Sequence, residues 1–328
     1  MNQPLNIGVI GLGVMGRRML ERLDAHPRLH ATRVWDAAPA ALQAVLRKHP
    51  QLQPAASAAA LIDSPGLHGL YIATPPAAHL NLSEAAFDAG LAVLCEKPLT
   101  VDFDAARHTL ARIEREGQRA AVNFSLASSP GLAALQQAFG AAGDAQCGTL
   151  QSVEIELGFT AWPRAWQAAA GAWLSQRAEG GFGREVLSHF VFVLQRVLGP
   201  ATVQRSAVDY PDDGVGAEIA LSANLLAGGV PVSIDARVDA ALSTPDHNRM
   251  RWCGSRGEIE LGEWFGLLQR RSGEGWGAAG DAALHRAAGQ AAQLEQWVQL
   301  IEGRPHGLPS YAEALAVQRT IEALLAGV

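Results

Sequence analysis

Hydrophobic and polar positions change rhythm near residue 125, and this change divides the chain into two predicted domains. Before residue 125, short apolar runs alternate with segments of helical periodicity. The runs lie at 7–10, 31–35, 53–56, 67–74, 91–95 and 119–124. Apolar runs that alternate with helices are typical of parallel strands covered by helices on both faces. Residues 1–124 are therefore expected to form a doubly wound parallel sheet of the α/β class.

The segments between these runs predict the helices that connect the strands. They cover the residues after Gly16, then 37–50, 57–63, 77–89 and about 100–116. Thr100 is expected to cap the last of these helices, because a hydroxyl accepts a hydrogen bond from the first turn.

After residue 125, strands follow one another with few helices between them. Strands are expected at 150–159, 202–209, 217–227, 230–239, 249–254, 257–261 and 266–271, and helices at 130–140, 183–198, 284–302 and 310–326. Apolar and polar residues alternate from Val232 to Val238, which indicates a sheet with one apolar face. Residues 125–328 are expected to form an α+β domain on a large, open, mainly antiparallel sheet. Its predicted roles are substrate binding and oligomerisation, and its last helix is expected to pack back on residues 1–124.

Composition narrows the classes of function. The chain has 328 residues, which is more than one ordinary hydrophobic core accommodates. Its net charge of −6 argues against a nucleic-acid or anionic-membrane partner. No apolar run is long enough to span a bilayer, and no basic-then-apolar leader is evident. Three isolated cysteines form neither a metal-binding pattern nor a disulfide framework, so a reducing cytoplasm is expected and no metal is predicted.

The first strand ends in a glycine motif that predicts a dinucleotide site. Gly11 permits the tight turn, Gly13 lets the backbone approach a pyrophosphate, and Gly16 allows close packing of helix on strand. The pyrophosphate is expected on the helix N-terminus, where free N–H groups and the helix dipole favour anions. The predicted binding loop comprises Gly11, Leu12, Gly13, Val14, Met15 and Gly16. The alternative is a strand–turn–helix without a ligand.

Asp36 follows the second strand and predicts the choice of cofactor. It lies 20 residues beyond Gly16, where a carboxylate binds the ribose hydroxyls of the adenosine half. A carboxylate at this position repels a 2′-phosphate, and residues 37–39 supply no cation to hold one. We therefore expect NAD rather than NADP.

Two further positions carry candidate acid–base groups. Of 26 basic residues only Lys48 and Lys97 are lysines, and Lys97 follows the fifth strand, where it is expected near the nicotinamide. Lysine, unlike arginine, gives up a proton when its pKa is lowered. Glu185 and His189 lie four residues apart on a predicted helix, where a carboxylate can orient an imidazole for acid–base work. The alternatives are an ordinary surface lysine and an ordinary surface pair.

Taken together, these motifs resemble the Gfo/Idh/MocA oxidoreductase family (glucose–fructose oxidoreductase, inositol dehydrogenase and rhizopine catabolism). The resemblance rests on the glycine motif, Thr74-Pro75-Pro76 with His79, Glu96-Lys97-Pro98, and the Gly180-Gly181 segment that leads to Glu185 and His189. It implies a Rossmann fold in residues 1–124 and NAD- or NADP-dependent oxidoreduction of sugars, cyclitols and related alcohols. It also implies assembly as a homodimer or homotetramer through the open sheet.

The resemblance also assigns roles to residues. Thr74, Pro75, His79 and Glu96 are implied to line the cofactor site with Lys97, and Lys97, His189 and Glu185 are implied to be catalytic. The sequence departs from the family pattern at Glu185, where aspartate is usual, at Phe192, where many members carry another aspartate, and at 125–129, where Asn and Arg are often found. These changes favour a less polar ring, such as a cyclic diol, beside Phe192 and Trp173, with Trp162 and Trp166 as further candidate walls.

The expected reaction is hydride transfer between nicotinamide and a secondary alcohol or ketone of a sugar, cyclitol or cyclic diol. His189 or Lys97 is expected to remove the hydroxyl proton, and Glu185 to hold His189. Two alternatives stay open: a non-catalytic NAD-bound sensor or regulatory protein, because the fold can bind a dinucleotide without turnover, and an NAD-assisted enzyme that cleaves a C–O bond.

Overall fold

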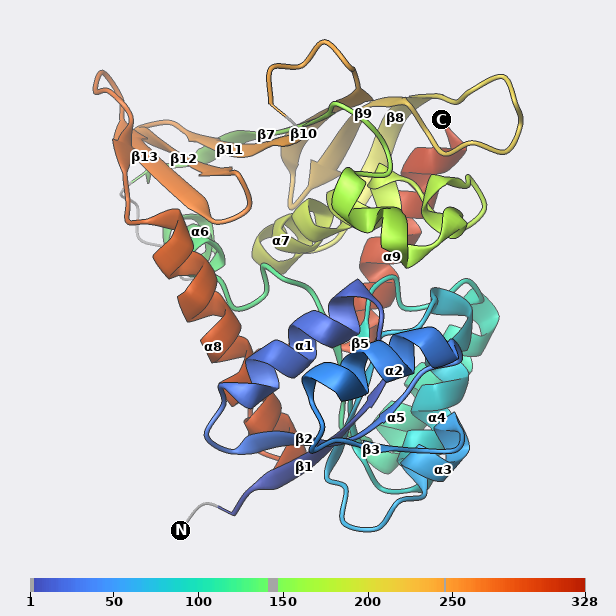
Figure 1. The fold of residues 1–328 in the computed structure, drawn as a ribbon. Helices are drawn as coiled ribbons and strands as arrows, with labels where there is room; N and C mark the ends of the chain where they lie inside the picture. Colours follow the sequence, from blue (N-terminus) through green and yellow to red (C-terminus); the bar gives the residue numbers. More distant parts are fainter. Residues whose placement is uncertain (1–2, 141–146, 245, 328) are drawn as a thin grey trace. The chain divides into compact units, whose positions relative to one another are not determined.

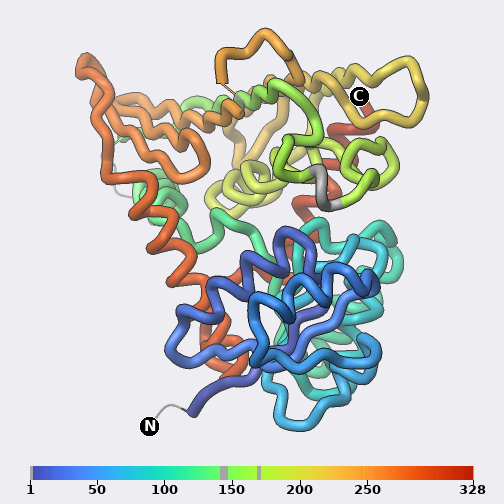
Figure 2. Tube along the Cα trace, in the orientation of Figure 1, coloured from blue at the N-terminus to red at the C-terminus, as the bar shows by residue number. Residues whose placement is uncertain are grey.

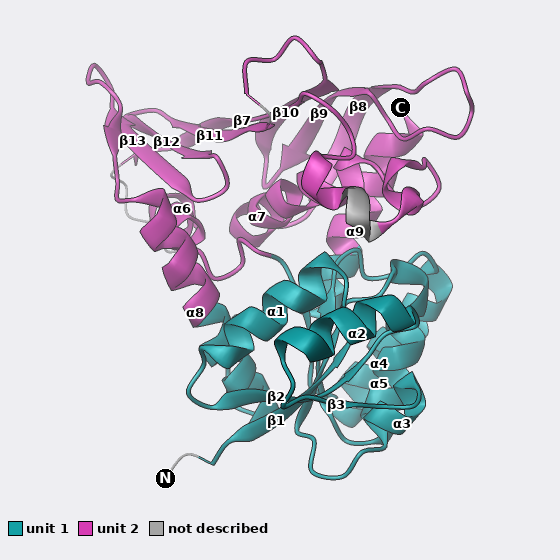
Figure 3. Cartoon of the chain, in the orientation of Figure 1, with its two compact units in different colours: residues 1–124, 292–315 teal, residues 125–291, 316–328 magenta. Residues whose placement is uncertain are grey.

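The computed structural model describes residues 3–140, 147–244 and 246–327. The chain divides into two compact units, one of residues 1–124 and 292–315 and one of residues 125–291 and 316–328 (Figure 3). The path of the chain can be followed by colour in Figure 2.

The first unit contains a six-stranded sheet in the order β3-β2-β1-β4-β5-β6, and its five strand pairs are all parallel. Its strands are β1 Leu5–Ile10, β2 Leu29–Trp35, β3 Gln53–Pro54, β4 Gly69–Ile72, β5 Ala92–Glu96 and β6 Ala120–Asn123. Its helices are α1 Val14–Asp24, α2 Pro39–Lys48, α3 Ala58–Ile62, η1 Pro76–Ala78, α4 His79–Asp88 and α5 Phe103–Glu116 (Figure 1). The predicted doubly wound parallel sheet is confirmed, and strand order reverses between β1 and β4, where such sheets bind ligands.

The sheet is buried because its strands are apolar on both faces. Ile7, Val9 and Tyr71 are completely buried in one cluster with Trp297. Trp297 belongs to α8 Ala282–Ile301, and its ring centroid lies 6.1 Å from that of Tyr71. The second half of α8, from residue 292, therefore completes the core of the first unit.

The prediction that Thr100 caps α5 is wrong. The helix begins at Phe103, and the carboxylate of Asp102 accepts hydrogen bonds of 2.9 Å from the N–H groups of Asp104 and Ala105. Thr100 instead accepts a bond from the N–H of Asp102. An anionic cap complements the helix dipole more strongly than a hydroxyl, which favours the later start.

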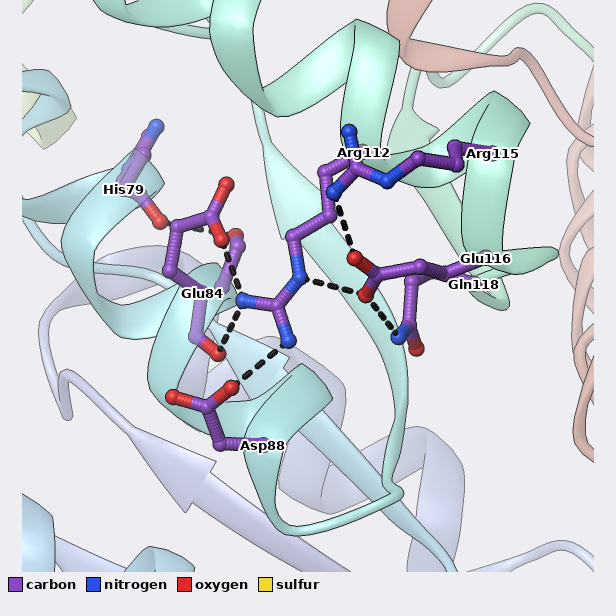
Figure 4. A network of polar contacts seen from close by, with 8 residues as sticks. His79, Glu84, Asp88, Arg112, Arg115, Glu116 and Gln118 are labelled. Atoms are coloured by element: carbon purple, nitrogen blue, oxygen red, sulfur yellow. Dashed lines mark hydrogen bonds and ion pairs between the residues drawn. The ribbon is translucent and has the colours of Figure 1, made fainter.

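Arg112 of α5 forms hydrogen bonds that link this helix to α4 (Figure 4). Its guanidinium donates to Glu84 over 2.5 Å and to Asp88 over 2.6 Å on α4, and to Glu116 on its own helix over 2.8 Å. The bond from Arg112 lowers the pKa of Glu116 to about 2, with a smaller contribution from Arg115.

The second unit contains an eight-stranded sheet in the order β14-β13-β12-β11-β7-β10-β9-β8. Its strands are β7 Leu150–Phe159, β8 Ala201–Asp209, β9 Ala220–Ala227, β10 Val230–Val238, β11 Asp246–Gly254, β12 Gly257–Gly262, β13 Gly266–Arg271 and β14 Gly277–Ala278. The prediction of a mainly antiparallel sheet is confirmed. The exception is the parallel pair β7–β10, which is possible because the long segment between these strands provides a crossover.

Helices and short turns complete the second unit. They are α6 Pro130–Phe139, η3 Ala165–Ala170, η4 Ala172–Ser175, η5 Gly183–Leu187, α7 Ser188–Leu198 and the last part of α9 Tyr311–Ala326. α7 lies against the apolar face of the sheet, in contact with β9 (Figure 1). The other face carries ion pairs such as Arg249 with Glu156 and Arg251 with Glu260. Within the described ranges, no helix is long and apolar enough to cross a membrane.

Candidate functional site

The glycine loop between β1 and α1 has the geometry that its spacing predicts. Gly11 has φ +91°, and a Cβ atom there would lie 2.4 Å from the carbonyl oxygen of Ala73. A Cβ atom on Gly16 would lie 1.9 Å from the carbonyl oxygen of Gly11. Neither position has room for a side chain. A Cβ atom on Gly13, in contrast, would meet no atom of the described residues within 4 Å.

The N-terminus of α1 is therefore open at Gly13. Gly13 is the N-cap, and no side chain in the described part of the chain caps the helix there. The first N–H groups of a helix have no partner within it, so this end can receive an anion. The loop fits the pyrophosphate of a dinucleotide.

Asp36 lies directly after β2 and is bonded to the glycine loop. Its Oδ2 accepts a hydrogen bond of 2.6 Å from the N–H of Leu12, and its Oδ1 accepts one of 2.7 Å from the N–H of Ala38. Each carboxylate oxygen keeps acceptor capacity for a ribose hydroxyl. The same two bonds fix the carboxylate in position before any ligand arrives.

Thr74 and His79 follow β4, which lies across from β1 at the point where the strand order reverses. The Thr74 hydroxyl is buried without a hydrogen-bond partner among the described residues. His79 is completely buried, and its Nδ1 and Nε2 face the carbonyl oxygens of Pro98 and Thr74 at 2.9 and 2.8 Å. Burial lowers the pKa of His79, while its bonds to carbonyl groups act in the opposite direction. His79 thus ties together the segments that follow β4 and β5.

Glu96, at the end of β5, belongs to a buried polar network. Its Oε1 accepts hydrogen bonds from the Tyr71 hydroxyl on β4 and, over 2.6 Å, from the Asn123 amide on β6. Gln293 of α8 donates to Asn123 Oδ1 over 2.7 Å. Burial raises the pKa of Glu96 and, together with the nearby Glu96 carboxyl, raises that of Tyr71. The network fixes the strand end from which half-buried Lys97 follows.

In the second unit, Glu218 shapes the turn before the predicted catalytic helix. Its carboxyl is almost fully buried, and its Oε1 accepts a hydrogen bond of 2.6 Å from the N–H of Gly183. Gly181 has φ +96°, and a Cβ atom there would lie 2.1 Å from Oε2 of Glu218. Burial raises the pKa of Glu218. A glycine at position 181 is therefore required by both the backbone and the neighbouring carboxyl.

The sequence predicts one continuous helix over residues 183–198, and the structure differs from this prediction. Residues 183–187 form a π-helix, in which Ser188 N–H donates to the Gly183 carbonyl, and α7 begins at Ser188. The N–H of Gly183, the first residue of this segment, donates to Glu218. Glu185 lies in the π-helix and His189 in α7, and such π-turns are frequent at functional sites.

His189 is buried against an aromatic side chain that the sequence analysis did not select. Its ring centroid lies 5.3 Å from that of Trp264, with an interplanar angle of 79°. Trp264 is in the loop between β12 and β13. Neither it nor Glu218 stands near a recognisable motif, so only tertiary contacts reveal them.

The aromatic residues proposed as substrate walls occupy different environments. Phe192 is almost fully buried, with the Arg196 guanidinium 4.9 Å from its ring centroid. Trp162 donates to the carbonyl of Leu174 and packs edge-on against Phe159. Trp173 is half-buried in η4, before the glycine turn. Lys97 belongs to the first unit and Trp173, Glu185, His189 and Phe192 to the second, so their meeting at one substrate stays a prediction.

The sequence of the first unit is similar to that of known oxidoreductases. A model described as "Oxidoreductase family, NAD-binding Rossmann fold" (GFO_IDH_MocA) matches residues 5–124. Inositol 2-dehydrogenase of Streptomyces avermitilis is 34% identical over 122 residues, which are 37% of this chain and 36% of that protein. The match to this curated relative thus spans about a third of its length.

Solved structures resemble the chain over nearly its full length. An oxidoreductase from Agrobacterium radiobacter in complex with NAD+, L-tartaric acid and magnesium has a TM-score of 0.83 at 17% identity, covering 99% of this chain and 97% of that one. KijD10, a 3-ketoreductase from Actinomadura kijaniata in complex with NADP and TDP-benzene, has a TM-score of 0.80 at 18% identity, with 99% and 98% covered. At these identities the likeness concerns the fold.

Proposed function

We propose that the chain is an NAD-dependent oxidoreductase of the Gfo/Idh/MocA family, whose NAD-binding Rossmann-fold model matches residues 5–124. The proposed reaction transfers a hydride between the nicotinamide and a secondary alcohol or ketone of a sugar, cyclitol or cyclic diol. The observation that carries the proposal is the pairing of an open helix N-terminus at Gly13 with the Asp36 carboxylate fixed beside the same loop.

These residues fit the cofactor and favour NAD over NADP. The N–H groups at the start of α1 would bind the pyrophosphate, and Asp36 would bind the ribose hydroxyls. A 2′-phosphate would bring negative charge towards the Asp36 carboxylate, and residues 37–39 carry no cation to offset it. When bound, the nicotinamide supplies the hydride acceptor or donor.

Lys97 and His189 are the proposed acid–base groups. Lys97 follows β5 at the carboxyl edge of the parallel sheet, the edge at which such sheets bind ligands. His189 is the second candidate, because histidine side chains transfer protons near neutral pH. In the oxidative direction one of them accepts the hydroxyl proton, and Glu185, one turn earlier, orients His189.

The names of the curated relatives favour a cyclic polyol as substrate, since several are inositol 2-dehydrogenases. Phe192 stands where many family members carry an acidic residue, and its buried ring offers no polar group to a sugar hydroxyl. Within the proposed substrates, a cyclitol or a less polar cyclic diol is therefore favoured, with Trp173 as the candidate wall.

The test measures NAD reduction with a panel of cyclitols, cyclic diols, aldoses and linear alcohols. The absorbance of NADH reports the reaction. We expect turnover with at least one cyclic substrate. Binding of NAD without turnover of any alcohol or reduction of any corresponding ketone would instead support the non-catalytic sensor. Release of a dehydrated or deglycosylated product with no net NADH would support C–O bond cleavage. Light scattering would measure whether the protein is the expected homodimer or homotetramer.

A further inference from the structure

The loop between β12 and β13 holds two large side chains in a conformation that normally favours glycine. Gly262 and Gly266 pair across the hairpin, and between them Glu263 has φ +49° and Trp264 has φ +72°. In this region the Cβ atom crowds the following carbonyl oxygen, so a tryptophan there is a rare and strained choice. No other non-glycine residue of the described chain has a positive φ.

Asn248 on the neighbouring strand β11 keeps the loop in this conformation. Its main-chain oxygen accepts a hydrogen bond of 3.0 Å from the N–H of Glu263. Its side-chain Oδ1 accepts one of 2.7 Å from the N–H of Trp264. Asn248 is almost fully buried, so both bonds are shielded from water and resist exchange. Strain that the surroundings hold so firmly is characteristic of functional positions.

The strained loop directs the Trp264 indole onto the helix that carries His189. The indole meets the His189 ring nearly at right angles, with 5.3 Å between ring centroids. It also packs on Phe190, the next residue of α7, with a centroid distance of 5.8 Å. A glycine or asparagine would satisfy the loop with less strain, but neither could make these contacts. The contact with α7 therefore accounts for a tryptophan at this position.

We infer that Trp264 is a positioning residue, which fixes the orientation of the His189 imidazole for proton transfer. An edge-to-face aromatic contact restricts rotation of the smaller ring about its χ2 bond. A correctly aimed imidazole reaches the substrate proton over one hydrogen-bond length, and a misplacement of about 1 Å can cost about a hundredfold in rate. The inference rests on the proposed function in one respect: that function identifies the proton that His189 transfers.

The first experiment measures the imidazole itself, with protein labelled at histidine with 15N and with the His189 signal assigned from an H189Q variant. We expect the W264A variant to change the tautomer ratio or line width of the His189 signal, and W264F to retain most of the wild-type behaviour. W276A is the matched control, because Trp276 stacks on Arg270 and Arg251 elsewhere on the same sheet. An unchanged His189 signal in W264A would overturn the inference.

The second experiment measures turnover with the substrate that the panel identifies. W264A is expected to lower kcat by about 10- to 100-fold, to leave the Kd for NAD unchanged, and to alter the pH profile of kcat. N248A keeps the indole and the main-chain bond to the N–H of Glu263 but releases the N–H of Trp264, so it is expected to have a smaller effect in the same direction. Normal kcat and a normal pH profile in folded W264A would contradict the inference.

The two experiments separate this inference from the proposed function. If no alcohol is turned over but the His189 signal still changes in W264A, the contact positions the imidazole and the proposed function alone is wrong. If turnover is found and the W264A signal and pH profile match the wild type, the function stands and Trp264 has only a structural role.

Discussion

The carboxylate of Asp36 accepts a hydrogen bond of 2.6 Å from the backbone N–H of Leu12, which joins the end of β2 to the glycine loop. A residue proposed to select the cofactor thus also shapes the loop that receives the pyrophosphate. Loss of this carboxylate should therefore affect both properties.

Asp36→Ala is expected to weaken NAD binding by about 10- to 100-fold, the loss of a hydrogen bond to a charged group. Binding of NADP should weaken less, because removing the carboxylate also removes repulsion of the 2′-phosphate. Titration calorimetry with both cofactors measures the two changes. An equal loss for NAD and NADP would contradict the assignment of Asp36 to the ribose.

Gly13 and Gly16 form a matched pair that separates binding from folding. Gly13→Ala adds a methyl group in open space, so the melting temperature should hardly change, while NAD affinity falls by about tenfold or more as the pyrophosphate is pushed away. Gly16→Ala places a methyl group against the Gly11 carbonyl and should destabilise the fold by roughly 1–3 kcal/mol. Thermal unfolding and NAD titration of both variants check the contrast, and a large loss of stability in Gly13→Ala would refute it.

Lys97→Ala should reduce turnover by about 10²- to 10⁴-fold, the usual contribution of a general acid or base, with NAD affinity largely kept. Lys48→Ala is the control, because Lys48 is the other lysine of the chain and lies exposed in an ion pair with Glu21. Steady-state kinetics of both variants measure the difference. Lys97 would be excluded from the mechanism by equal turnover in the two.

Glu96 should give the protein a pH-dependent stability. Burial raises its pKa in the folded state above the unfolded value of 4.5, so the folded protein binds more protons just above this pH. Stability should therefore fall as pH rises from the unfolded pKa through the folded one. Glu96→Gln removes this titration and should flatten the dependence. Urea unfolding at a series of pH values compares the two proteins, and parallel curves would show that Glu96 does not titrate in this range.

Features encoded by local spacing could be predicted from the sequence. Gly11, Gly13 and Gly16 follow a strand–turn–helix pattern in which each glycine has one physical explanation. The structure leaves no room for a side chain at Gly11 and Gly16 and leaves open space at Gly13. The parallel sheet of the first unit follows from the alternation of apolar runs with helical segments. The prediction of the α5 cap was wrong because Thr100 and Asp102 are both residue types that cap helices well, and only the fold decides between them.

Features that depend on tertiary contacts could not be predicted. The π-helix before α7 begins at Gly183, whose N–H donates to Glu218, 35 residues away. The positive φ of Trp264 depends on Asn248 of another strand, and tryptophan by itself gives no sign of that conformation. The parallel pairing of β7 with β10 is likewise a property of the connection and not of either strand.

The contribution of α8 to the first unit has a consequence for how the protein folds during synthesis. Trp297 completes a core whose strands lie in the first 124 residues, yet the ribosome makes it only after another 167 residues, 125–291, have been added. In the nascent chain, the surface beside Tyr71 therefore stays exposed until translation is almost finished. Chaperones that hold apolar surfaces should therefore remain on the emerging chain through most of its elongation, and release should coincide with the arrival of its last two helices.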